Sequence, residues 1–151
     1  MESKLKVADP EVLMPRIKSL VDQGQTVPLV ISGGSMVPFL VHGRDTVYLS
    51  AVDRPLKKGD MILYRRDSGA YILHRICAVR GETCDLVGDA QTVIEPGIRK
   101  EQILALVTAA RRKGTLLKKG SFLWWLFEKL WIRMIPVRPA LLRLYRRITG
   151  R

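Results

Sequence analysis

The chain is poor in histidine and cysteine. Its 151 residues include only two histidines and two cysteines. A structural zinc ion usually takes four such ligands, so two cysteines without a matching histidine pair form no zinc site, and we expect no metal and no other cofactor. Because nothing in the sequence indicates export, Cys77 and Cys84 are expected to be reduced. His42 and His74 are the only imidazoles available for acid–base chemistry.

The sequence also lacks an apolar run that could span a membrane, which takes about 20 residues. The most apolar stretch, from Phe122 to Ile135, is shorter than that, and it contains Glu128, Lys129 and Arg133. We therefore expect no transmembrane helix in this segment.

Charged residues interrupt residues 1–24, so we expect neither a signal peptide nor an N-terminal membrane anchor there. Apolar residues at helical spacing predict a short helix within residues 1–25 instead. Asp9 and Pro10 suit its N-cap and first position, and Gly24 suits its end. Because a proline inside a helix removes a hydrogen bond, a start at Pro15 is the alternative.

The positive charge is concentrated at one end of the chain. The net charge is +12, and residues 111–151 hold twelve Lys and Arg against a single acid, Glu128. A basic tail attracts polyanions. However, the sequence has neither a helix-turn-helix pattern nor zinc ligands, and the six apolar residues 122–127 are poor phosphate contacts. We therefore expect no nucleic-acid partner.

The pattern of residues 26–113 predicts a mainly β domain, because short β-branched runs alternate with Gly, Asp and Pro. Arg80-Gly81 reads as a two-residue hairpin loop, which would place Cys77 opposite Cys84. The predicted strands are residues 26–31, 45–50, 60–65, 70–79, 83–87 and 103–110.

The segment from Ile31 to Phe39 presents Ser35 between two glycines and Pro38. Such a serine is a candidate nucleophile if the fold supplies a base and donors for an oxyanion, although a Ser-Gly-Gly-Ser turn also simply ends a strand. His74 lies in a period-2 segment and shares one face with apolar neighbours, where a histidine is usually structural.

Five blocks, in order, resemble the signal peptidase I family and its relatives, the LexA-like repressor autoproteases. Gly34–Pro38 resembles the family's nucleophile box, and Gly43–Val47 resembles the start of the strand after it. Lys57–Tyr64 resembles its Gly-Asp strand, and Tyr71–Ile76 resembles its general-base strand. Gly88-Asp89 resembles its last box. The resemblance implies a small signal-peptidase-like β-barrel or complex β-sheet domain with Ser35 as the nucleophile.

The resemblance also implies the base and its partner. Bacterial signal peptidases have a lysine as the base, whereas the endoplasmic-reticulum and archaeal-type enzymes have a histidine, which His74 matches. Glu95 falls where the family's later aspartate orients the histidine, and Asp89 of the Gly-Asp pair is the alternative. A histidine base predicts an activity limb with an apparent pKa around 6 to 7. His42, Lys57 and Lys58 are weaker candidate bases.

The oxyanion donors are less well marked. The backbone N–H of Ser35 is the expected donor. Gly33 occupies the position at which many relatives carry an additional hydroxyl, so Ser32 is the nearest hydroxyl that could help. Gly34 and Met36 flank the nucleophile and are expected to contact the substrate or the oxyanion.

Residues 114–151 are expected to form a basic tail of amphipathic helices. A helix starting at Pro139 would have an apolar face and end at Gly150. Trp, Arg and Leu on such helices suit the membrane interface, although a tail that packs back onto the β domain is the alternative. The expected membrane-binding residues are Trp124, Trp125, Trp131, Arg143, Arg146 and Arg147.

Together these patterns predict a serine endopeptidase that cleaves a peptide or protein precursor at the cytoplasmic face of an anionic membrane. The absence of a DNA-reading domain disfavours the repressor branch of the family. The alternative is a catalytically idle relative that binds an extended peptide by strand addition.

Overall fold

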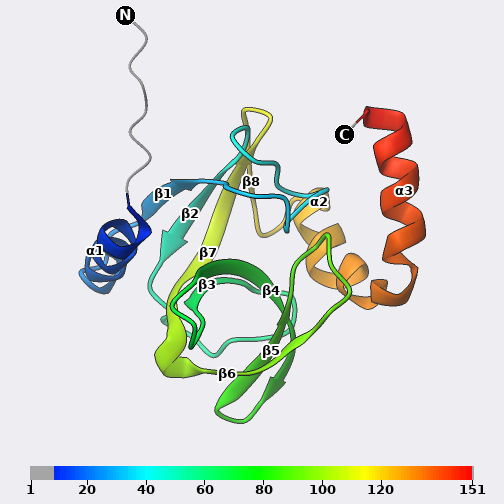
Figure 1. The fold of residues 1–151 in the computed structure, drawn as a ribbon. Helices are drawn as coiled ribbons and strands as arrows, with labels where there is room; N and C mark the ends of the chain where they lie inside the picture. Colours follow the sequence, from blue (N-terminus) through cyan, green and yellow to red (C-terminus); the bar gives the residue numbers. More distant parts are fainter. Residues whose placement is uncertain (1–8, 151) are drawn as a thin grey trace, which may run out of the picture.

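The structure is a computed structural model that describes residues 9–150 (Figure 1). Its first element is helix α1, Pro10–Asp22, and the Asp9 carboxylate caps it by accepting a hydrogen bond from the Glu11 N–H. The helix therefore starts at Pro10, and the alternative start at Pro15 is wrong because Pro15 lies inside it. Residues 1–8 of the predicted N-terminal segment lie outside the described residues.

An eight-stranded antiparallel sheet forms the body of the molecule, which confirms the mainly β fold. The sheet order is β1-β2-β7-β3-β4-β5-β6, with β8 also pairing with β7. Figure 1 shows the sheet strongly curled, with α1 at one end and the C-terminal helices at the other. The strands are β1 Val27–Val30, β2 Thr46–Ser50, β3 Met61–Arg65, β4 Tyr71–Arg80, β5 Thr83–Val87, β6 Glu95–Arg99, β7 Ile103–Arg112 and β8 Thr115–Lys118.

Two of these strands were not predicted from the sequence. Strand β6 begins Glu-Pro-Gly, a composition that argues against a strand, and it is tolerated because β6 lies at the edge of the sheet. Strand β8 lies in the basic segment after residue 113, so the sheet extends into the part of the chain expected to be a helical tail.

The predicted pairing of Cys77 with Cys84 is wrong. The hairpin loop is Gly81-Glu82, one residue later than predicted, so Val79 faces Cys84. A β-bulge between Ile76 and Ala78 then leaves Cys77 without a direct partner on β5. Both cysteines are free thiols.

The C-terminal segment packs against the β-sheet domain. Phe127 stacks on the buried Phe39 with ring centroids 4.7 Å apart, and Trp124 meets the same ring edge-on at 6.1 Å. Between residues 9 and 150, no helix has both the length and the apolar character to cross a bilayer. The segment consists of α2 Phe122–Trp125, a π-helical turn Leu126–Leu130, 3₁₀ turns Trp131–Arg133 and Ile135–Val137, and α3 Arg138–Thr149, which ends at Gly150 in the left-handed conformation.

This packing partly buries two of the three tryptophans. Trp124 and Trp131 lie against the hydrophobic core. Trp125 remains half exposed.

Candidate active site

Ser35 lies in a series of turns between β1 and β2. Neither its hydroxyl nor its backbone N–H bonds to another group of residues 9–150, so both are available to a ligand. The Gly33 N–H donates to His42 Nδ1 at 2.9 Å, which ties the start of this loop to the turn before β2. His42 therefore holds the loop, which does not fit its candidacy as an alternative base.

The other predicted residues of the loop have different environments. Ser32 and Gly34 are exposed, and Ser32 lies at the same cavity as Ser35. The Met36 side chain is buried in the core, where it also lines that cavity. This cavity, which we call the Ser35 cavity, has a volume of about 160 Å³ and apolar walls that include Leu29, Leu63 and Leu73.

A glycine brings the Ser35 loop against the loop between β5 and β6. The Ala90 N–H donates to the Ser35 carbonyl at 2.9 Å. A Cβ atom on Gly88 would lie 2.6 Å from that same carbonyl oxygen, closer than real Cβ contacts allow. Only glycine fits at residue 88, which gives the Gly-Asp pair of the sequence a physical reason.

Asp89 has a different partner from the predicted one. Its carboxylate accepts two hydrogen bonds from the Arg75 guanidinium, both at 2.9 Å, and both side chains are almost fully buried. Arg75 also donates to the Gly59 carbonyl at 2.8 Å. Within residues 9–150, no hydrogen bond joins Asp89 to His74, so its direct contacts are those of a structural ion pair.

The C-terminal segment holds the same loop from outside. Trp131 Nε1–H donates to the Asp89 carbonyl at 2.9 Å, and fully buried Arg138 donates to the carbonyls of Gly88 and Gln91 at 3.0 and 2.9 Å. Burial lowers the pKa of Arg138. The segment therefore braces the loop that contacts Ser35, a role that the sequence analysis missed.

His74 comes from β4, directly opposite Ile62 of β3, and only 4 % of it is exposed. Its Nδ1 lies 3.4 Å from the Tyr64 hydroxyl. That hydroxyl also bonds to both oxygens of Glu95, at 3.0 and 3.1 Å, while Arg66 pairs with Glu95 at 2.7 Å. Glu95 thus reaches His74 through Tyr64 rather than directly.

This chain of contacts defines the tautomer of His74. A phenol has one proton, and an ionised carboxylate only accepts, so Tyr64 donates to Glu95. The Tyr64 oxygen can then only accept from His74, which puts the imidazole proton on Nδ1 and leaves a lone pair on Nε2. Burial raises the pKa of Tyr64, and the Glu95 charge adds to this, so the phenol keeps its proton.

The pKa of His74 is lower than the 6 to 7 expected from sequence. Burial, together with the positive charge of Arg66, lowers it from 6.5 to about 4, and Glu95 and Asp89 oppose the shift. The imidazole is therefore neutral at pH 7, as a general base must be.

This shift predicts a pH dependence of stability. Below pH 6.5 the unfolded chain protonates His74, whereas the folded protein does so only near pH 4, so stability is lost as the pH falls through this window. We expect a loss of about 3 kcal/mol from this residue between pH 7 and 4. Urea unfolding of wild type and His74→Gln at both pH values measures it, and equal losses in the two proteins would contradict it.

Ser35 and His74 line two different cavities, which have no lining residue in common. The second, which we call the His74 cavity, has a volume of about 760 Å³ and is lined by His74, Ala90, Glu95 and residues of α3. Ala90 of the His74 cavity bonds to the Ser35 carbonyl. Leu73, which precedes His74 on β4 and points to the opposite face of the strand, lines the Ser35 cavity. Within the described chain no hydrogen bond joins Ser35 to His74.

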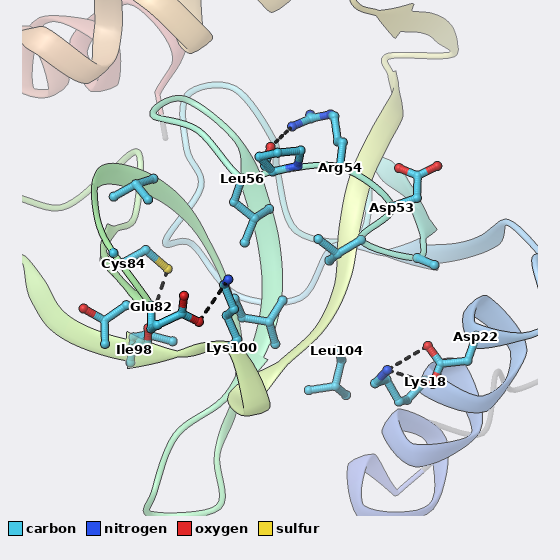
Figure 2. Close-up of a pocket in the computed structure, with 17 residues that line it drawn as sticks. Lys18, Asp22, Asp53, Arg54, Leu56, Glu82, Cys84, Ile98, Lys100 and Leu104 are labelled. Carbon is cyan, nitrogen blue, oxygen red and sulfur yellow. Dashed lines mark hydrogen bonds and ion pairs between the residues drawn. The ribbon is translucent and has the colours of Figure 1, made fainter.

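A third cavity, of about 670 Å³, lies between α1, the segment before β3 and the β4–β5 hairpin (Figure 2). Its lining includes neither Ser35 nor His74. Two of its lysines already have acidic partners, because Lys18 pairs with Asp22 at 2.7 Å and Lys100 with Glu82 at 3.1 Å. It contributes no group to the candidate site.

The described residues contain no cluster of three His, Cys, Asp or Glu side chains suited to a metal ion. Comparisons with family models, curated proteins and solved structures gave no match for this chain.

Proposed function

We propose that the protein is a serine endopeptidase in which Ser35 is the nucleophile and His74 the general base. The observation that carries the proposal is that the Gly88–Ala90 loop contacts both segments, because Ala90 bonds to the Ser35 carbonyl and Asp89 pairs with Arg75, which follows His74 on β4. One presents a serine whose hydroxyl and N–H are both available, and the other presents a neutral, tautomer-fixed histidine. This is the pair of groups that acyl transfer requires.

In the proposed reaction, Ser35 Oγ attacks the scissile carbonyl while His74 Nε2 takes its proton. The Ser35 N–H stabilises the oxyanion, and His74 returns the proton to the leaving amine. Water then hydrolyses the acyl-enzyme by the same route. Tyr64 and Glu95 act as positioning residues, because Tyr64 holds the imidazole and the Glu95 carboxylate opposes the charge that the imidazole acquires.

Unpaired strand edges support an extended peptide as the substrate. Strand β1 is at the end of the sheet, and β5 pairs with β4 only from Arg75 onward, so Tyr71–Leu73 has β3 alone as a neighbour. The Ser35 cavity lies between these edges. A peptide that adds a strand there would insert a small apolar side chain into the cavity beside the nucleophile.

Covalent labelling tests this proposal. A fluorophosphonate should phosphonylate Ser35 Oγ with loss of fluoride, and the label should be found on the Ser35 peptide by mass spectrometry. His74→Ala should slow labelling at least about 100-fold, the lower range for general-base catalysis. His42→Ala should slow it far less, because His42 only holds the loop. An equal labelling rate in wild type and His74→Ala would exclude His74 as the base.

One observation favours the idle relative as a second candidate function. No hydrogen bond joins Ser35 to His74 in the described chain, as expected of a peptide-binding module in which these two residues do no catalysis. In active peptidases such bonds also tighten only with substrate. Peptide binding without labelling of Ser35 would decide for this second function.

We further propose that the protein lies peripherally at the cytoplasmic face of an anionic membrane. Phe122 and Trp125 stack at 6.0 Å and are 71 % and 50 % exposed, which suits insertion at an interface. Leu144, Ile148 and Arg147 are exposed on α3.

Vesicle co-sedimentation tests the membrane proposal. Phe122→Ser/Trp125→Ser should weaken binding to phosphatidylserine vesicles at least about 10-fold, through lost apolar burial. Val12→Ser, which changes an exposed apolar residue on α1, is the matched control. Equal binding by all three proteins would exclude this pair as the membrane contact.

A further inference from the structure

The His74 cavity has an unusual wall. Helix α3 contributes Leu142, Arg143 and Arg146 to it, and the lining also includes the loop 90–94 and the start of β6. Arg143 and Arg146 are three residues apart and both exposed, so the helix presents two guanidinium groups along the cavity.

The charge of this cavity is not balanced. Glu95 is its only acid, and Arg66 and Tyr64 already engage both of its oxygens. Among residues 9–150, neither Arg143 nor Arg146 has an ion pair or a hydrogen bond to a side chain. Helix α3 contains no acid at all, so two positive charges face a cavity with no counter-charge left for them.

The position of the His74 cavity suits the part of the substrate that leaves as the amine. In the proposed mechanism His74 delivers its proton to the departing amine, so His74 must face the C-terminal side of the scissile bond. The His74 cavity contains this residue and not Ser35, whereas the Ser35 cavity contains the serine and not the histidine. A substrate would therefore place residues after the scissile bond toward Arg143 and Arg146.

We infer that the His74 cavity is a subsite for an acidic side chain located after the scissile bond, with Arg143 and Arg146 as its specificity-determining residues. This inference rests on the proposed peptidase function. Guanidinium groups suit carboxylates because they offer parallel N–H donors. The preferred substrates are thus peptides with an apolar residue for the Ser35 cavity and Asp or Glu beyond the cleaved bond.

A mixed peptide library digested by the full chain tests the inference. Cleavage sites read by mass spectrometry should be enriched in Asp and Glu after the scissile bond. For a matched pair of peptides that differ only by Glu or Gln there, kcat/KM should favour Glu about 10-fold, as a charge-assisted contact gives. Arg143→Gln/Arg146→Gln should bring this ratio near one. Arg133→Gln, at another exposed arginine of the tail, should keep it.

Three other results would overturn the inference. One is cleavage by wild type without an acidic preference, which keeps the peptidase and removes the subsite. Another is loss of the ratio in Arg133→Gln as well, which makes it an effect of net charge. The third is a double variant that loses phosphatidylserine-vesicle binding while keeping the ratio, which assigns the arginines to lipid.

Binding to Ser35→Ala separates this inference from the proposed function. Fluorescence anisotropy with the labelled Glu and Gln peptides needs no cleavage. If no peptide is cleaved by wild type and Glu is still preferred in binding, the peptidase proposal fails and the acidic subsite stands.

Discussion

Ser35→Ala is expected to lower kcat/KM for any cleaved peptide by at least about 10³-fold, because residues that act as a catalytic unit lose most of their effect together. The free energy of unfolding should stay within about 0.5 kcal/mol of wild type. The Ser35 hydroxyl has no hydrogen bond to lose within the described chain. The contacts that hold its loop use backbone atoms, such as the Ala90 bond to the Ser35 carbonyl.

The measurement pairs peptide turnover, followed by mass spectrometry, with urea unfolding of the same samples. Ser68→Ala is the matched control, since Ser68 is also a turn serine beside a glycine but lies between β3 and β4 and lines neither site cavity. Unchanged turnover in Ser35→Ala would remove Ser35 as the nucleophile. A loss of turnover that follows a loss of folding would make the residue structural.

Much of the sheet could be predicted because its strands are short β-branched runs separated by turn residues. Strand β6 could not be predicted, because Pro96 and Gly97 are uncommon in strands and β6 is stabilised by its pairing with β5. The predicted β4–β5 register was wrong because the hairpin loop lies one residue later, at Gly81-Glu82. The β-bulge at Cys77 depends on packing in three dimensions, so it could not be predicted from the alternation of residues along the strand.

Of the candidate site residues, Ser35 and His74 could be named from motif resemblance, whereas Tyr64 could not. Tyr64 looks like a core residue of β3. The period-2 pattern does place Tyr64 on the same face of β3 as Ile62, which lies opposite His74 in the paired strand. The contact between Tyr64 and His74 could therefore be inferred once the strand register was known. The route from Glu95 to His74 through a phenol required the structure.

The tail was ambiguous for a physical reason. Trp and Arg on short amphipathic helices satisfy the membrane interface, and they serve equally well to cover a protein surface that offers free carbonyls. The loop of Gly88 and Asp89 offers such carbonyls to Arg138 and Trp131. This partner is 42 to 50 residues earlier in the chain, beyond the reach of any local pattern.

Asp89→Asn is expected to lower the free energy of unfolding by about 3–5 kcal/mol, the cost of leaving a buried charge without its partner. Arg75 and Asp89 have side chains that are 1 % and 0 % exposed, and the Arg75 guanidinium would face a neutral amide that can accept only one of its two bonds. The loss should also loosen the Gly88–Ala90 loop, so activity falls together with stability.

Asp67→Asn is the control, because Asp67 pairs with Arg99 at 3.0 Å but is 78 % exposed, and such a pair contributes about 0–1 kcal/mol. A double variant, Arg75→Met/Asp89→Leu, removes both charges and should regain part of the stability lost in Asp89→Asn. These values come from urea unfolding at pH 7. If Asp89→Asn instead folds as stably as wild type while the acid limb of kcat/KM moves, Asp89 acts on His74 electrostatically, and the orienting role passes to it from Glu95.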